Sequence, residues 1–240
     1  MSSTSPGTPI AGATALVTGG NRGLGLALVD ELLARGAAKV YATSRSPHRP
    51  SDARVVPLVL DVTDDAAVAA AAQAAPDVSI VVNNAGVLLH TPVLTAPLNQ
   101  LRAELETNLF GTLRVARAFA PALARHERSA LVDVLSVLSW ISFGSGYEVS
   151  KSAAWSATNG LRLALRDQGT TVTGVHVGYM DTDMTAGVDA PKSDPRDIAR
   201  LTVDAIAAGE LEVVADDISR QVRAGLSGGV AALYPEPAAA

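Results

Sequence analysis

Short apolar segments alternate along the chain with longer segments rich in alanine and leucine. Residues 13–18, 79–84 and 130–135 are apolar at almost every position, which is typical of strands buried on both faces of a parallel sheet. Four further segments have a strand-like composition. We therefore predict seven strands, at 13–18, 39–43, 55–60, 79–84, 130–135, 171–177 and 211–215.

Several of the longer segments begin with the start signals of helices, an Asp or a Pro near the first turn. They predict helices at about 24–35, 64–75, 97–127, 149–168 and 196–208. The repeated order of strand and helix predicts an α/β fold, a doubly wound Rossmann-type domain with a mostly parallel sheet of about seven strands flanked by helices. Such sheets bind ligands beyond the carboxyl ends of their strands, so chemistry is expected in the loops that follow strands.

Composition narrows the class of protein. The 240 residues, 48% of them hydrophobic, suit a single domain over 1–240, and we expect 1–12 and 233–240 to be flexible. A net charge of -5 argues against a nucleic-acid or membrane-surface partner. Cysteine is absent and the four histidines lack ligand spacing, so no metal site is expected. We find no leader or membrane span and expect a cytoplasmic protein.

The segment "TGGNRGLG", residues 18–25, follows the first predicted strand and enters the first predicted helix. Gly19, Gly23 and Gly25 permit a tight turn and a close approach to a pyrophosphate, whose charge would meet the helix N-terminus. An ordinary strand-to-helix turn is the alternative interpretation. The strand before the segment and the amphipathic helix after it favour a dinucleotide site.

Six motifs in a fixed order carry a more specific signal than any one of them. They are "TGGNRGLG" (18–25), "LDVTD" (60–64), "NNAG" (83–86), "TNLFGT" (107–112), "LSVLSW" (135–140) and "YEVSK" (147–151). With these motifs the chain resembles, over nearly its whole length, the short-chain dehydrogenase/reductase superfamily, in particular its NADP(H)-preferring carbonyl reductases and alcohol dehydrogenases.

The resemblance implies roles for individual residues. Cofactor contacts are implied for Asp61 and Val62 at the adenine, for Asn83, Ala85 and Gly86 beside the ribose, for Gly178 and Thr182 on the nicotinamide side, and in the glycine loop for Gly19, Asn21, Arg22, Gly23, Leu24 and Gly25. The implied catalytic set is Asn108, Ser136, Tyr147 and Lys151, of which Tyr147 and Lys151 also contact the cofactor and Asn108 holds a relay water by its backbone. Taken singly, Asp61 could be a helix-capping acid and Asn108 a polar interruption of a helix; their joint occurrence favours function.

The segment after the second strand indicates which nicotinamide cofactor is used. Ser44 and Arg45 stand there, with no acid before Asp52. A carboxylate would repel a 2′-phosphate, whereas a guanidinium can bind it with two hydrogen bonds. Arg22 offers a second cation, although both arginines could also be ordinary solvated charges. The pattern predicts NADP(H).

Tyr147 and Lys151 are four residues apart, so on a helix they share one face. Reduction of a carbonyl leaves an alkoxide that needs a proton, and a tyrosine near an ammonium can supply it from a lowered pKa. Ser136 would donate a second hydrogen bond to the substrate oxygen. It stands 11 residues before Tyr147, about two fewer than the family leads us to expect, and Ser139, Ser142 and Ser145 remain alternatives.

The substrate side departs from the family in two further respects. Val177-Gly178 stands where the family usually has Pro-Gly, and the segment after Thr182 is short, which suggests an open, apolar pocket. The candidate walls are Leu88, Leu138, Trp140, Tyr179 and Met180, each of which could equally belong to the core or to a dimer surface.

The prediction is therefore an NADPH-dependent reductase of a small hydrophobic ketone or aldehyde, reversible as an alcohol dehydrogenase. A reductase of a carrier-bound 3-oxoacyl group or polyketide is the alternative, and a nonenzymatic NADP-sensing regulator is less favoured because sensing needs no proton donor. The resemblance also implies a homodimer or homotetramer formed through 97–127 and 149–168.

Overall fold

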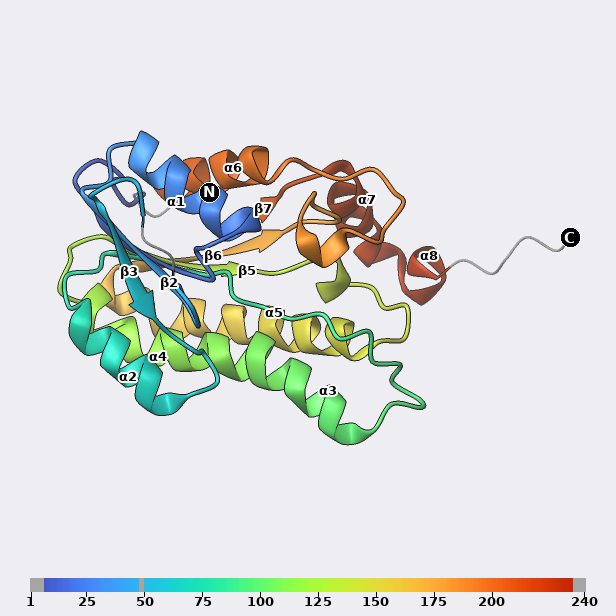
Figure 1. The fold of residues 1–240 in the computed structure, drawn as a ribbon. Coiled ribbons are helices and arrows are strands. Elements are labelled where there is room, and N and C mark those ends of the chain that lie inside the picture. Colours follow the sequence, from blue (N-terminus) through green and yellow to red (C-terminus); the bar gives the residue numbers. More distant parts are fainter. Residues whose placement is uncertain (1–6, 48–49, 235–240) are drawn as a thin grey trace, which may run out of the picture.

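The protein is described here by a computed structural model that covers residues 7–47 and 50–234. Its seven strands form one parallel sheet in the order β3-β2-β1-β4-β5-β6-β7 (Figure 1). The strands are β1 (Thr14–Thr18), β2 (Lys39–Ser44), β3 (Val55–Val59), β4 (Ile80–Asn83), β5 (Ser129–Val134), β6 (Thr170–His176) and β7 (Glu212–Val214). All seven predicted strands are confirmed, and the change of direction between β1 and β4 is the switch point at which such sheets bind ligands.

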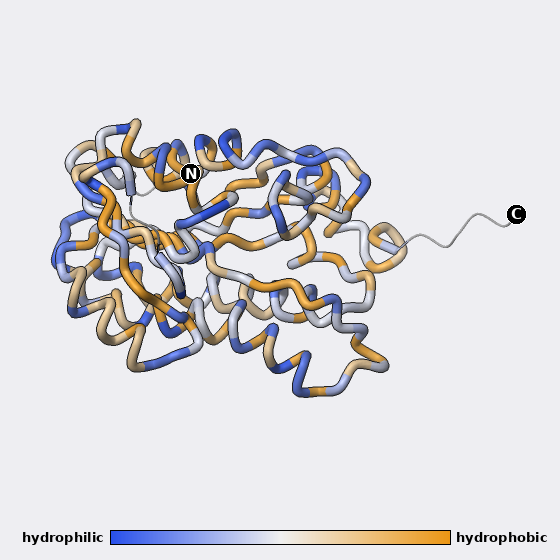
Figure 2. Tube along the Cα trace, viewed as in Figure 1, coloured by the Kyte–Doolittle hydropathy of each residue, from blue (hydrophilic) through white to orange (hydrophobic). Residues whose placement is uncertain are grey.

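Helices cover both faces of the sheet (Figure 1). One face carries α1 (Gly23–Ala34) and α6 (Pro195–Ala208), and the other α2 (Asp65–Ala74), α4 (Thr112–Leu123) and α5 (Gly146–Ala164). The sheet therefore separates two apolar cores, with Leu28 and Ile198 in one and Leu131 and Phe119 in the other. Figure 2 shows hydrophobic positions along the central strands and hydrophilic ones on the outer turns of the helices.

The predicted helix 97–127 is interrupted. It consists of α3 (Leu98–Leu105), a π-helical turn (Glu106–Gly111) and α4, which ends at Leu123. A π turn inserts one residue into the helix and frees backbone groups locally, and it occurs often at functional sites. Asn108 lies in this turn. The prediction of one regular helix over 97–127 is therefore wrong around Asn108, a predicted site residue.

The helix α5 starts three residues earlier than predicted. A capping box formed by Ser145 and Glu148 fixes its first turn. The Ser145 side chain accepts from the Glu148 amide, and the Glu148 side chain accepts from the Ser145 amide. Tyr147 thus lies in the first turn of the helix.

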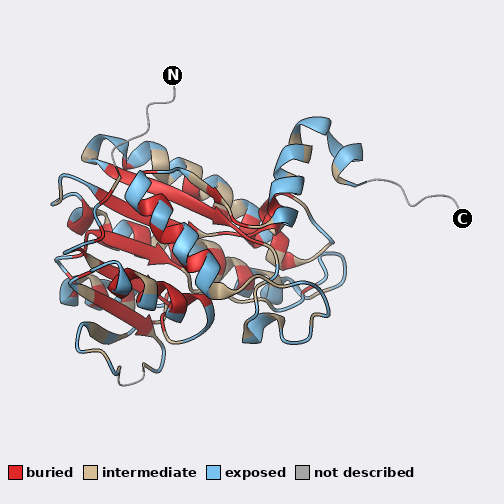
Figure 3. Ribbon diagram, turned by 90° about the horizontal axis from the view of Figure 1, so that it is seen from above, coloured by how far each residue is buried: buried red, intermediate tan, exposed pale blue. Residues whose placement is uncertain are grey.

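The two ends of the described chain differ. Residues 7–12 belong to the segment expected to be flexible, yet Thr8 and Ile10 are buried and the Thr8 amide bonds to the Ile206 carbonyl at 3.0 Å. At the other end α7 (Asp217–Gly225) and α8 (Val230–Leu233) project from the body with exposed surfaces (Figure 3). Residues 1–6 and 235–240 lie outside the described part. None of the described helices is long and apolar enough to cross a membrane.

Candidate active site

The loops that follow the strands meet at one edge of the sheet because all strands run in the same direction. Gly19 follows β1 and has a φ of 68°, a conformation that favours glycine. Gly25 opens α1 beneath it, where a Cβ would lie 2.1 Å from the Gly19 carbonyl oxygen. This close approach requires glycine. With Gly23, Leu24 and Asn21 it forms a glycine cradle at the N-terminus of α1, a position at which helices can bind phosphate groups.

The two asparagines after β4 have different tasks. Asn83 is buried and donates to an Asp133 carboxylate oxygen at 2.9 Å, so its side chain braces the sheet; its place beside a ribose stays a prediction. Asn84, which sequence analysis passed over, donates to the carbonyls of Thr18 (2.9 Å) and Gly19 (3.3 Å). The Thr18 hydroxyl accepts from the amides of Asn84 and Ala85. These bonds tie the "NNAG" turn, with Ala85 and Gly86, to the glycine loop.

Polar groups gather at the end of β2. The Asn21 side chain donates to the Ser44 hydroxyl at 2.6 Å and to the Ser46 carbonyl at 2.9 Å. Arg45 is exposed, and its charge helps to lower the pKa of Asp61, mainly lowered by hydrogen bonds from Thr63. Buried Val62 follows Asp61. Guanidinium, hydroxyl and amide groups, all able to bind phosphate, therefore lie together here.

Arg22 points elsewhere than predicted. It forms an exposed ion pair of 3.0 Å with Asp183, across the glycine loop. Thr182, next to Asp183, packs over the same loop, since a Cβ on Gly23 would lie 3.2 Å from its methyl carbon. The segment after β6 therefore crosses above the glycine loop, which brings Thr182 to the expected side of the site.

A hydrogen-bond network surrounds Lys151, which is buried. Its Nζ donates to the Val134 carbonyl at 2.8 Å and lies 5.7 Å from the centre of the Tyr147 ring. Asn108 donates to the Ser150 hydroxyl at 2.9 Å, and Ser150 donates to the Tyr147 carbonyl at 2.7 Å. A Cβ on Gly86 would lie 3.2 Å from Asn108 Oδ1 and 3.8 Å from Lys151 Nζ. Asn108, Tyr147 and Lys151 are thus brought together, with Ser150 a member that sequence analysis missed.

Ser136 completes the set. It follows β5, is buried, and its side chain lies near enough to the Tyr147 hydroxyl to favour the phenolate. The alternative serines are engaged otherwise: Ser139 Oγ accepts from the Ser136 amide at 3.3 Å, and Ser142 donates to a Glu148 carboxylate oxygen at 2.6 Å. Ser145 caps α5. Despite the short spacing to Tyr147, the structure brings Ser136 to the phenol.

The acidities of the pair differ from the expectation. Burial raises the pKa of Tyr147 to about 12; the Ser136 side chain opposes this rise and the charge of Glu104 adds to it. Burial lowers the pKa of Lys151 to about 8, opposed by Asp133. The protein's own groups therefore do not lower the pKa of Tyr147, because removal of water outweighs the opposing effect of Ser136. The phenol is protonated at neutral pH, the form that can donate.

Glu104 is a second group that sequence analysis missed. It is fully buried at the end of α3, accepts from the Leu89 amide at 2.8 Å, and accepts from the Thr91 hydroxyl. A Cβ on Gly146 would lie 2.4 Å from its Oε2. A buried carboxylate thus lies against the backbone that precedes Tyr147. Only its position four residues before Asn108, on the apolar side of a helix, could have signalled this.

The predicted substrate walls separate into two kinds. Leu88 and Leu138 are half-buried beside the site loops, Tyr179 is 44% exposed, and Met180 packs partly against the core. Trp140 is 8% exposed and its ring stacks on His176, so it belongs to the core, and its prediction as a wall is wrong. An indole needs a large flat contact, and the β6 histidine provides one.

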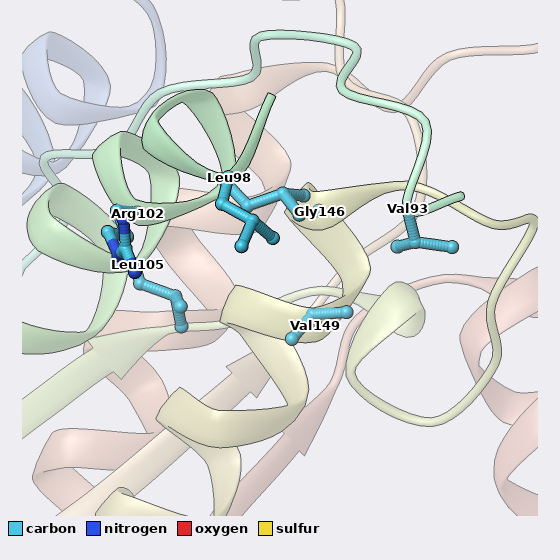
Figure 4. Close-up of a pocket in the computed structure, with 7 residues that line it drawn as sticks. Val93, Leu98, Arg102, Leu105, Gly146 and Val149 are labelled. Carbon is cyan, nitrogen blue, oxygen red and sulfur yellow. The ribbon is translucent and has the colours of Figure 1, made fainter. Parts of the chain in front are cut away.

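A separate apolar hollow of about 210 Å³ lies between α3 and the first turn of α5 (Figure 4). It is lined by Val93, Leu98, Leu101, Arg102, Leu105, Gly146 and Val149. None of the predicted site residues lines it. Over residues 7–47 and 50–234, no cluster of three or more acidic or histidine side chains could hold a metal.

The fold and this edge define a nucleotide-binding α/β enzyme with a Ser-Tyr-Lys set. A family model described as short chain dehydrogenase matches residues 13–193, and the chain belongs to this family of oxidoreductases.

Two curated relatives and one solved structure illustrate the similarity. The 1-deoxy-11-beta-hydroxypentalenate dehydrogenase of Streptomyces exfoliatus is 32% identical over 222 residues, which cover 85% of this chain and 76% of the relative. The 3-oxoacyl-(acyl-carrier-protein) reductase MabA of Mycobacterium tuberculosis is 32% identical over 187 residues, covering 75% and 74%. A crystal structure of a short chain dehydrogenase from Burkholderia cenocepacia in complex with NADP is 38% identical, with a TM-score of 0.87 and coverage of 92% and 95%.

Proposed function

We propose that the protein is an NADPH-dependent reductase that converts a small apolar ketone or aldehyde into an alcohol, and that the reaction is reversible. The observation that carries this proposal is the meeting of Ser136, Tyr147 and Lys151 at the carboxyl edge of the sheet, beside the glycine cradle. A sensor would need the cradle alone, whereas a proton donor with its own hydrogen-bond network serves a reaction.

The residues divide the chemistry between them. A bound dihydronicotinamide would supply the hydride. The Tyr147 hydroxyl gives its proton to the oxygen that becomes an alkoxide, and Ser136 donates a second hydrogen bond to the same oxygen. Lys151 stabilises the phenolate left behind, since its ammonium lies 5.7 Å from the ring centre. Asn108 and Ser150 hold the backbone of this turn in place.

NADP(H) is favoured over NAD(H) by the end of β2. Ser44, Asn21 and Arg45 offer donors and a positive charge there, and no carboxylate stands between Ser44 and Asp52. The cradle fits a pyrophosphate because Gly25 admits the backbone approach that any side chain would block. The 38% identical structure in complex with NADP supports the same choice.

The substrate is proposed to be apolar because the half-buried Leu88, Leu138 and Met180 lie in the loops that follow β4, β5 and β6. A carrier-bound 3-oxoacyl group is the second candidate, supported by the 32% identity to MabA. Both candidates use the same site.

Self-association belongs to the proposal as well. The π turn and α5 carry exposed apolar side chains, Phe110 (47%) and Leu163 (65%), which a second copy of the chain would cover. Trp155, also in α5, packs partly against Trp140.

The experiment is an initial-rate measurement of NADPH oxidation with a graded panel of aldehydes, aryl ketones, ketoesters and acyl thioesters. Turnover of the apolar ketones and aldehydes with NADPH above NADH is expected. Turnover of acyl thioesters alone would select the second candidate, and no turnover of any carbonyl would contradict the proposal.

A further inference from the structure

Three aromatic side chains, Trp140, Trp155 and His176, form a cluster beside Ser136. The rings of Trp140 and His176 are stacked, with centres 3.8 Å apart and an angle of 16° between their planes. Trp155 meets both edge-on, at 6.2 Å from Trp140 and 6.3 Å from His176. His176 is fully buried at the end of β6. A stacked and an edge-on neighbour together leave the imidazole ring little freedom to rotate.

The His176 ring contacts the backbone of Ser136. Its Nδ1 lies 3.1 Å from the carbonyl oxygen of Ser136. A carbonyl only accepts hydrogen bonds, so Nδ1 carries the proton in this contact. Burial lowers the pKa of His176 to about 4, so the ring is neutral at working pH and Nδ1–H is its single donor. The other nitrogen, Nε2, is 3.8 Å from a Glu212 carboxylate oxygen.

The C-terminal segment holds the outer side of this cluster. Arg223 of α7 lies 5.6 Å from the centre of the Trp140 ring and forms an ion pair of 3.0 Å with Glu212 of β7. Asp216, between them, accepts from the Gly178 amide at 2.6 Å. Figure 1 shows β7 and α7 at this end of the sheet. The segment therefore contacts both the loop of Ser136 and the turn that follows β6.

The serine is also held within its own turn: its amide donates to Ser139 Oγ at 3.3 Å, and its carbonyl accepts from the Ser139 amide at 2.9 Å as well as from His176. It lies beyond the last ladder residue of β5, and its hydroxyl accepts from the Leu138 amide at 3.1 Å and lies 3.4 Å from the Val177 carbonyl. The run to Tyr147 is short, so a small rotation of the Ser136 peptide would carry the hydroxyl away from the phenol. A bond to the Ser136 carbonyl resists this rotation directly.

We propose that His176 is a positioning residue for Ser136: its Nδ1–H fixes the Ser136 peptide, and the stack on Trp140 fixes His176. This inference rests on the proposed carbonyl reduction, since Ser136 matters only if its hydroxyl meets the substrate oxygen. It assigns a function to two aromatic side chains, one of which seemed from the sequence to line the substrate pocket.

A kinetic double-mutant cycle tests the inference. His176→Phe keeps a ring on Trp140 but loses the donor, whereas His176→Asn keeps a donor near the position of Nδ1. We expect His176→Phe to lower kcat roughly tenfold with KM for NADPH unchanged, and His176→Asn to retain kcat within about threefold. In a Ser136→Ala background, His176→Phe should change kcat by less than about twofold, because the group it positions is gone.

Equal losses from His176→Phe in both backgrounds would overturn the inference, since they would show that the ring acts through packing. If His176→Phe does not fold, His176→Asn decides alone, and a loss as large as that of Ser136→Ala overturns the inference. A measurement without substrate separates this failure from failure of the proposed function. Long-range nitrogen–proton NMR of the parent protein should show His176 as the neutral Nδ1–H form between about pH 5 and 8, and the Nε2–H form would contradict the donor role.

Discussion

Tyr147 is the proposed proton donor, and opposing neighbours set its acidity. Removal of water and the charge of Glu104 both favour the neutral phenol, and the Ser136 side chain favours the phenolate. Lys151 is also buried, which lowers its own pKa to about 8. The balance suits reduction at neutral pH, because the phenol carries its proton before the hydride arrives. Alcohol oxidation needs the phenolate and should therefore require higher pH.

Glu104→Gln tests this balance at a single residue. Loss of the negative charge lowers the pKa of Tyr147, so the rising limb of kcat/KM for alcohol oxidation should move to lower pH, by roughly half a unit or more. The pH profile of NADP-dependent oxidation of a secondary alcohol measures it. Glu106→Gln, at an acid that pairs with Arg114, is the control and should leave the limb in place. An unmoved limb in Glu104→Gln would contradict the electrostatic role.

Cofactor preference is also decided at single residues. Ser44→Asp with Arg45→Ala puts a carboxylate where a 2′-phosphate is proposed to bind, so the ratio of kcat/KM for NADPH over NADH should fall at least about tenfold. Arg196→Ala removes an exposed arginine that pairs with Asp194 and serves as the matched control. An unchanged ratio in the double variant would show that the phosphate is bound elsewhere.

At the scale of elements, periodicity and propensity predicted all seven strands and the main helices. They could do so because the buried face of a strand or helix requires apolar residues at regular positions. They missed the π turn around Asn108, since nothing in a local pattern reveals one inserted residue. They also could not tell the tasks of the adjacent Asn83 and Asn84 apart. Asn83 and Asn84 are adjacent and of one type, and only the sheet decides that Asn83 bonds to Asp133 while Asn84 braces the glycine loop.

The helix α5 provides a matched pair of glycines for a test of packing. A Cβ at Gly146 would lie 2.4 Å from side-chain atoms of Glu104, Leu101 and Thr91, whereas a Cβ at Gly160 meets nothing within 4 Å. Gly146→Ala should therefore destabilise the protein by about 1–3 kcal/mol, and Gly160→Ala should stabilise it by roughly 0.5–1 kcal/mol. Urea denaturation measures both, and equal effects would contradict the packing described for the first turn of α5.

At the scale of the whole molecule, buried His176 couples folding to pH. Its pKa is about 4 in the folded chain and ordinarily 6.5, so below pH 6.5 the unfolded chain binds the proton first. This group's share of stability is present above about pH 6.5 and is lost as the pH falls toward 4, by at most about 1.4 kcal/mol per pH unit. Denaturation of His176→Phe and parent protein across this window should show a flatter dependence in the variant, and parallel curves would contradict the assignment.

The molecule as a whole joins the glycine loop after β1, the proposed proton donor on α5 and a C-terminal segment that packs against the loop of Ser136. The fold follows from the chain's apolar pattern, whereas the packing of the C-terminal segment follows from contacts between residues far apart in the chain, such as the bond between Gly178 and Asp216 and the proximity of Arg223 to Trp140. Such pairings cannot be recognised from one sequence.

The central claim is that Tyr147 gives the proton in an NADPH-dependent carbonyl reduction. The most direct measurement is the rate of NADPH oxidation by Tyr147→Phe with the best ketone of the panel, together with NADPH binding by fluorescence titration. The account predicts a loss of about a thousandfold in kcat with NADPH still bound, because the ring remains and only the hydroxyl is gone. A Tyr147→Phe variant that reduces the ketone at the parent rate would contradict it.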